Sequence, residues 1–138
     1  MLFLVLVLTA CSSDDSTQAP ACVQNLSTQC AALYDPQTYQ TIYDKILHPT
    51  CATGNGTCHT SDGAKGGLVF ENVDTAYALL LGTSGGKVRV VPGNPACSLI
   101  VEKLESGDPT YRMPPGSEPL LAGERCTIEK WIAQGAKR

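Results

Sequence analysis

The chain has 138 residues, of which 43% are hydrophobic and 17% are charged, so it is long enough for one compact domain with a modest core. The net charge is -3 and the ten Lys and Arg residues are scattered, which argues against a nucleic-acid partner. Seven cysteines are many for this length, and they indicate either disulfides formed in an oxidising compartment or a metal centre.

The beginning of the chain has the features of an export signal. Residues Leu2–Leu8 form an apolar run that is too short to span a bilayer and matches the core of a secretory signal peptide. The L-T-A-C that follows resembles the lipobox of bacterial lipoproteins, in which the cysteine is lipidated and becomes the mature N-terminus. We therefore predict a signal peptide over residues 1–10, a lipid on Cys11, and a location in the bacterial cell envelope, facing the periplasm or on the outer membrane. The alternative is ordinary cleavage, which leaves Cys11 as an odd thiol.

The residues after this cysteine are polar and precede the folded part of the chain. Residues 12–21 lack large apolar side chains and are typical of a disordered tether. Cys22 and Cys30 bracket the short segment V-Q-N-L-S-T-Q, which a local disulfide could close. We expect residues 11–35 to form the tether with this loop, and residues 36–138 to form the domain.

Four segments have the apolar spacing of amphipathic helices. In each, apolar residues recur three or four positions apart, so that they lie on one face of a helix. The four faces comprise Tyr39, Ile42, Tyr43, Ile46 and Leu47; Val73, Ala76, Tyr77, Leu80 and Leu81; Cys97, Ile100, Val101 and Leu104; and Leu121, Ile128, Trp131 and Ile132. Trp131 is expected to fill the core.

The ends of these helices follow from the residues that flank them. The first helix should stop before Pro49, because the residue before a proline is disfavoured in the α region. Gly82 is placed to cap the second helix, and Asn94, which a proline follows, is placed to begin the third. The fourth should begin at about Leu121 and end near Gly135.

The part of the chain between the second and third helices contains the one strand-like run, K-V-R-V-V at residues 87–91, which predicts a short β-ribbon. No internal repeat and no Gly-rich phosphate-binding motif occurs, so the usual nucleotide-binding folds are not indicated. The chain is therefore predicted to be mainly α-helical, with connections rich in glycine and proline.

The stretch C-A-T-G-N-G-T-C-H, from Cys51 to His59, ends in the cysteine and histidine pair with which c-type cytochromes hold haem. Covalent attachment needs two thiols along one edge of the porphyrin and an imidazole below the iron, and Cys58 with His59 meets this need in one turn of chain. The usual motif has two residues between the cysteines, so the longer gap here must loop away and return. The glycine and asparagine residues at 54–56 permit such a loop because they tolerate positive φ.

Two other interpretations of these residues stay open. Cys51 and Cys58 could be joined in a disulfide that closes a small surface loop. A zinc site could use both of them with His59 and another cysteine, although the spacing fits no common zinc finger.

Met113 is the second candidate ligand. It lies in Y-R-M-P-P-G, where the prolines favour an extended and rigid chain that presents the thioether from a stiff loop. A histidine and methionine pair is the axial set of electron-transfer cytochromes c, and it leaves no open position on the iron for a substrate. This favours a carrier over an enzyme. The other histidine, His48, is expected to be a helix-end side chain.

Four motifs in this order, TCHTSDGAKGGL, VVPGNPACSLIVEKL, YRMPPG and EKWIAQGA, resemble the c-type cytochrome domains of myxobacteria and planctomycetes, which are related to class I cytochromes c. The resemblance covers about residues 36–137. It implies an all-α bundle of about four short helices around a haem, with Gly/Pro-rich loops. It also implies haem c as cofactor, thioethers to Cys51 and Cys58, His59 as the proximal ligand and Met113 as the distal ligand.

The other cysteines are then available for disulfides. With Cys11 assigned to lipid and two cysteines to haem or to each other, we expect Cys22 to pair with Cys30, and Cys97 with Cys126. The second bridge would clamp the third helix to the fourth. Four cysteines allow three connectivities, and the sequence alone leaves all three open.

The function that these expectations favour is an electron-transfer c-type cytochrome lipoprotein. Its partners would be redox proteins, and a lipid anchor would hold it at the membrane. No catalytic serine or cysteine lies beside a plausible base, which favours an electron carrier over an enzyme without deciding between them. Two alternatives stay open, which are a haem-free, disulfide-stapled lipoprotein domain with a binding or structural role, and a haem sensor or peroxidase-like enzyme.

Overall fold

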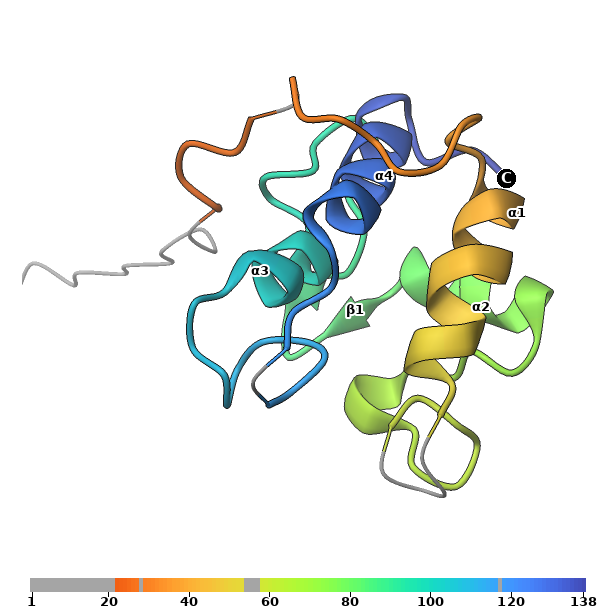
Figure 1. The fold of residues 1–138 in the computed structure, drawn as a ribbon. Coiled ribbons are helices and arrows are strands. Elements are labelled where there is room, and N and C mark those ends of the chain that lie inside the picture. Colours follow the sequence, from red (N-terminus) through yellow and green to blue (C-terminus); the bar gives the residue numbers. More distant parts are fainter. Residues whose placement is uncertain (1–21, 28, 54–57, 117) are drawn as a thin grey trace, which may run out of the picture.

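The computed structural model describes residues 22–27, 29–53, 58–116 and 118–138. The predicted signal peptide, the predicted lipidation site Cys11 and the predicted loop at 54–56 lie outside these residues. The elements are α1 (Tyr39–Ile42), η1 (Tyr43–Cys51), η2 (Lys65–Gly67), α2 (Val73–Leu80), β1 (Thr83–Ser84), β2 (Lys87–Val88), α3 (Leu99–Glu105) and α4 (Ala122–Ala133) (Figure 1). The prediction of a small, mainly helical fold is confirmed. Within the described ranges, no helix has the length and apolar character needed to cross a bilayer.

The first helix runs without a break from α1 into η1, and its predicted apolar face is buried against the core. Our prediction that it stops before Pro49 is wrong, because η1 continues through the proline to Cys51 as a π-helix. The N–H of Ala52 donates to the carbonyl of Leu47, five residues back, at 3.2 Å. Proline has no N–H to donate, and the wider hydrogen-bond register of the π-helix allows the helix to continue beyond Pro49. His48 is exposed on this helix, with its ring 5.5 Å from that of Tyr43.

The second helix and the ribbon form where they were predicted, although Leu81, which we placed on the buried face, is 40% exposed. The side chain of Asn72 caps α2 by accepting hydrogen bonds from the N–H groups of Asp74 at 3.1 Å and Thr75 at 3.0 Å. The ribbon predicted near residues 87–91 is present as β2, which pairs antiparallel with β1. Gly85 and Gly86 join the two strands with φ of 56° and 78°, and two positive φ angles are what a type I′ hairpin turn needs.

The third helix begins later than predicted. Asn94 does accept a hydrogen bond from the N–H of Cys97 at 3.2 Å, but it caps only a turn, and α3 begins at Leu99. The buried hydroxyl of Ser98 accepts from the N–H of Val91 and donates to the carbonyl of Asn94, each at 2.9 Å. These bonds hold Ser98 extended, so Cys97 lies in the turn before α3 and not on its apolar face.

The fourth helix is the centre of the core. Its buried residues include Ile128, Trp131 and Ile132, as predicted. Trp131 packs 5.7 Å from the ring of Tyr39, and its Nε1 donates to the carbonyl of Lys137 at 2.7 Å. Leu121, which we placed on the buried face, is 65% exposed because it precedes the first helical residue with an extended backbone.

Residues 22–27 and 29–34, here called the strap, lie beside α3 and α4 (Figure 1). The N–H of Val23 donates to the carbonyl of Ala96 at 2.8 Å, and the N–H of Leu33 donates to that of Gly123 at 2.9 Å. A strap that bonds to distant segments at both ends does not fold back on itself. The disulfides follow this course, so the cysteines of the strap pair with distant partners.

The disulfide pairing that we predicted is wrong. Cys22 is bonded to Cys97, and Cys30 is bonded to Cys126, with sequence separations of 75 and 96 residues. The prediction joined Cys22 to Cys30 because they bracket a short segment, and it left Cys97 and Cys126 as the second pair. The structure instead uses the two bridges to fasten the strap, one before α3 and one on α4.

Candidate functional site

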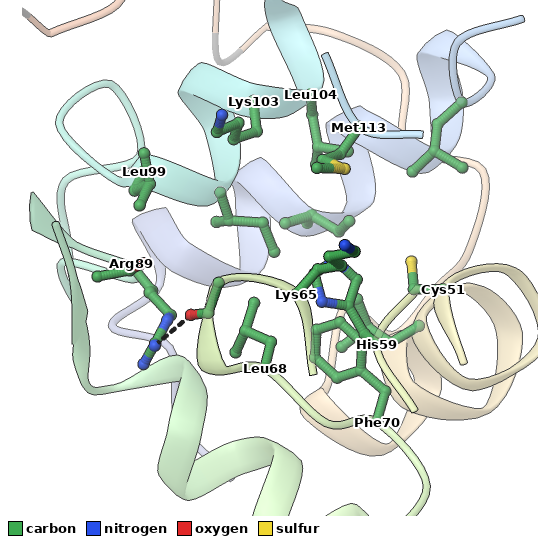
Figure 2. A pocket seen from close by; sticks show the side chains of 16 residues that line it. Cys51, His59, Lys65, Leu68, Phe70, Arg89, Leu99, Lys103, Leu104 and Met113 are labelled. Carbon is green, nitrogen blue, oxygen red and sulfur yellow. Dashed lines mark hydrogen bonds between the residues drawn. The ribbon is translucent and has the colours of Figure 1, made fainter. Parts of the chain in front are cut away.

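A cavity of about 340 Å³ lies between η1, the segment that follows it, α3 and α4 (Figure 2). A smaller hollow of about 180 Å³ shares five lining residues with it, so the two form one site. Most of the lining is apolar, as expected of a site for a flat hydrophobic ligand. The apolar walls of the larger cavity comprise Leu47, Leu68, Phe70, Leu99, Ile100, Leu104, Leu120 and Ile128.

His59 is held in this wall by its own backbone. Its N–H donates to the carbonyl of Cys51, the last residue of η1, at 3.1 Å, and its carbonyl accepts from the N–H of Phe70 at 2.8 Å. The His59 ring meets the ring of Phe70 edge-on, with centroids 5.2 Å apart. The buried hydroxyl of Tyr43 donates to the carbonyl of Phe70 at 3.0 Å, which ties this segment to the first helix.

The imidazole of His59 is chemically suited to a metal. Burial lowers its pKa, while the backbone groups of Lys65 and Leu68 act in the opposite direction. The net lowering favours the neutral ring, which is the form that binds metals. Its Nδ1 is buried and has no hydrogen-bond partner among the described residues.

The two cysteines of the predicted motif lie around the same hollow. Cys51 lines both cavities and Cys58 lines the smaller one. The thiol of Cys51 is not part of a disulfide, so the loop-closing bridge to Cys58 is not formed in the structure. Burial, with a smaller effect of Cys58, raises the pKa of Cys51 to about 12, which keeps it a neutral thiol.

Met113 reaches the site from the chain between α3 and α4. Its N–H donates to the carbonyl of Lys103 on α3 at 3.0 Å, and its side chain lines both cavities. Figure 2 shows Met113 beside Leu104 on the wall that α3 forms, with His59 on the facing wall and the sulfur of Cys51 directed toward the space between them. The four predicted site residues therefore converge, while His48 lines neither cavity.

The cavity is also lined by three cationic residues that the sequence analysis did not predict. They are Lys65, Arg89 and Lys103. Among the described lining residues of both hollows there is no Asp or Glu to balance them. The sequence signal for Arg89 was weak, since it shows only as a charged residue inside the apolar run K-V-R-V-V.

Arg89 is the most unusual of these cations because it is only 7% exposed. Its Nη1 donates to the carbonyl of Leu79 at 2.8 Å and its Nη2 to that of Gly66 at 2.7 Å, and the latter bond is drawn in Figure 2. Its buried Nε has no partner among the described residues, and burial lowers its pKa. A Cβ at Gly67 or Gly82 would come within 3.1 Å or 3.0 Å of the guanidinium, so both glycines leave room for it.

Residues 56–117 match the family model described as Planctomycete cytochrome C (PSCyt1). This match supports a planctomycete-type cytochrome c domain and confirms the resemblance drawn from the four motifs. It covers a little under half of the chain, includes Cys58, His59 and Met113, and begins after Cys51. Among curated proteins and among solved structures, nothing matches the chain.

The residues that line the two hollows fit a haem. The walls are apolar, the imidazole and the thioether face one another, and the unbalanced cations suit the carboxylate groups at the edge of a haem. In the described parts of the chain, no three His, Cys, Asp or Glu side chains cluster so as to hold a metal ion by themselves. The zinc alternative is therefore not supported, whereas a porphyrin supplies equatorial nitrogens of its own.

Proposed function

We propose that the protein is an electron-transfer c-type cytochrome that binds one haem, with His59 and Met113 as the axial ligands. The observation that carries the proposal is that these two side chains lie on facing walls of one apolar cavity that the thiols of Cys51 and Cys58 border. When bound, the haem iron supplies a reversible one-electron change. With an axial residue on each side, no position is left for a substrate, which favours a carrier over an enzyme.

The residues of the cavity would set the properties of this centre. The neutral ring of His59 provides a nitrogen lone pair, and the soft sulfur of Met113 favours reduced iron and so raises the potential. The apolar walls exclude water. Arg89 adds a buried positive charge, which also favours the reduced, less positive state.

We assign Cys58 and Cys51 as the thioether positions. Cys58 adjoins His59 in the chain and lies within the family match, which supports it most directly. Support for Cys51 comes from the backbone, since its carbonyl accepts from the N–H of His59 and so places the helix end next to the iron-binding residue.

A spectrum and a mass test this proposal. The full chain would be produced with the haem-attachment machinery and examined by pyridine haemochrome spectroscopy and intact mass. We expect one covalent haem, its loss in Cys58→Ala, and in Cys51→Ala a haemochrome band shifted to the position of a single thioether. A haem-free mass with Cys51 oxidised to Cys58 would overturn the proposal and favour the disulfide-stapled alternative.

We also propose that the domain is held at a membrane of the bacterial envelope through a lipid on Cys11 and exchanges electrons with redox proteins there. The support is the lipobox-like L-T-A-C after an apolar run. Labelling of the protein in cells with radioactive palmitate tests it, with Cys11→Ala as the control. Equal labelling of the two proteins, or none of either, would contradict the assignment.

A further inference from the structure

The segment that carries Met113, residues 106–116, has few anchors of its own. It connects α3 to the chain that leads into α4, and its first half is largely exposed. Its backbone touches α3 where the N–H of Met113 donates to the carbonyl of Lys103 at 3.0 Å. One backbone hydrogen bond at a half-exposed site contributes only about 1 kcal/mol, so a second anchor decides where the thioether lies.

That second anchor is Tyr111, two residues before Met113. Its hydroxyl donates to Oε1 of Glu102 on α3, and the Nζ of Lys103 lies 3.3 Å from the centre of its ring. The hydrogen bond to Glu102 is the first cause that raises the pKa of Tyr111 to about 12, so the hydroxyl stays a donor at neutral pH. Tyr111 is thereby fastened to α3 through its hydroxyl and its ring.

Glu102 is itself fixed from another element. The Nζ of Lys87, on β2, donates to both carboxylate oxygens of Glu102, at 2.8 Å and 2.7 Å. The carboxylate therefore accepts from the hairpin on one side and from the Met113 segment on the other. A hydrogen bond to an ionised, oriented acceptor is stronger than a neutral one.

We propose that Tyr111 and Glu102 are positioning residues for Met113, because their hydrogen bond holds the ligand segment on α3 with the thioether facing His59. The inference rests on the proposed function, since it assigns the residues that keep the sixth ligand in place. Neither side chain lines the cavity, so both act on the site through the chain that leads to Met113. Without this bond, the segment can move away from α3 and release the thioether from the iron.

Competition with imidazole measures the effect in the ferric holoprotein. Added imidazole binds iron only when Met113 is released, so its apparent affinity is proportional to the released fraction. We expect Tyr111→Phe to increase that affinity about tenfold or more and to weaken the near-infrared sulfur-to-iron band. Glu102→Ala should increase the affinity for imidazole as Tyr111→Phe does. Glu102→Gln keeps an acceptor, so its affinity for imidazole should lie between those of Glu102→Ala and the wild type.

Tyr77→Phe is the matched control. It removes a tyrosine hydroxyl that donates to the carbonyl of Ala136 at 3.0 Å, outside the Met113 segment, so it should lower stability without changing the affinity for imidazole. Equal affinity for imidazole in Tyr111→Phe and wild type, with haem bound, would overturn the inference. An equal increase in Tyr77→Phe would overturn it too, because the effect would then be a general loss of stability.

A measurement without haem separates this inference from the proposed function. Met113 is the one methionine besides Met1, so its ¹³C-labelled methyl group gives an assignable resonance in protein that carries no haem. We expect Tyr111→Phe to move this resonance toward the position of free methionine and Tyr77→Phe to leave it unchanged. A wild-type protein that never acquires haem refutes the proposed function, whereas an unmoved methyl resonance in Tyr111→Phe refutes the positioning role.

Discussion

The two disulfides of the strap give a quantitative prediction, because their connectivity fixes the size of the loops that they close. The perturbation is the double variant Cys30→Ala with Cys126→Ala, which removes one bridge and leaves that between Cys22 and Cys97 in place. A bridge stabilises a protein mainly by restricting the unfolded chain, and more so for a longer loop. The relevant loop is the shortest closed path through the bridge that is removed.

With the bridge between Cys22 and Cys97 intact, that path runs along the strap, across the bridge and on to Cys126, a loop of about 38 residues. The chain-entropy relation then gives a loss of about 4 kcal/mol in the free energy of unfolding. Removing the bridge between Cys22 and Cys97 instead opens the same closed path, so the expected loss is equal. The two double variants are therefore matched controls for each other.

Urea unfolding followed by circular dichroism gives the free energies, and non-reducing peptide mapping gives the connectivity. We expect both double variants to lose about 4 kcal/mol, and the wild-type map to contain the peptide pairs that include Cys22 with Cys97 and Cys30 with Cys126. A peptide in which Cys22 is joined to Cys30 would refute the reasoning. So would a loss below about 1 kcal/mol in both variants.

Three further predictions concern single side chains. Replacing Arg89 by Met should lower the reduction potential of the haem-loaded protein, because it removes a buried positive charge, whereas Arg89→Lys should keep most of it; equal potentials in voltammetry for all three proteins would contradict this role. Burial and the neighbouring Glu105 raise the pKa of Glu129 from 4.5 to about 7, so the unfolded chain releases this proton more readily than the folded one. The free energy of unfolding, measured in urea, should therefore fall as the pH rises from 4.5 to 7. Glu129→Gln should flatten this pH dependence, and an unchanged slope would contradict the assignment. Asn72→Ala should cost about 1 kcal/mol in urea unfolding because α2 loses its cap, and Asn72→Asp, which keeps the acceptor, should cost a few tenths; equal losses would show that the cap is not the cause.

The parts of the fold that could be predicted are those that depend on local spacing and local chemistry. The periodicity around Val73 predicted α2, and a histidine after a cysteine with a distant methionine before two prolines predicted the site residues. Each of these signals lies within a few residues of its effect. The structure confirms α2, and the predicted site residues line the two hollows.

The errors arise where contacts other than the local apolar pattern decide the structure. The chain passes Pro49 because the register of the helix widens, and α3 starts late because Ser98 bonds to Val91 instead of continuing the turn. The cysteines pair across the domain because the strap bonds to segments that are far away in the sequence. Arg89 was missed because its partners are backbone carbonyls, which leave no mark in the sequence.

The strap also sets an order of events during synthesis. Cys22 and Cys30 are synthesised before either of their partners, Cys97 and Cys126. In an oxidising compartment the first pair available for oxidation is therefore the local one between Cys22 and Cys30, which is not the native pair. The chain must either delay oxidation until its last helix is present or exchange this early bridge for the two long-range ones. The protein should thus depend on a thiol-disulfide isomerase for its yield of native molecules, independently of whether haem has been attached.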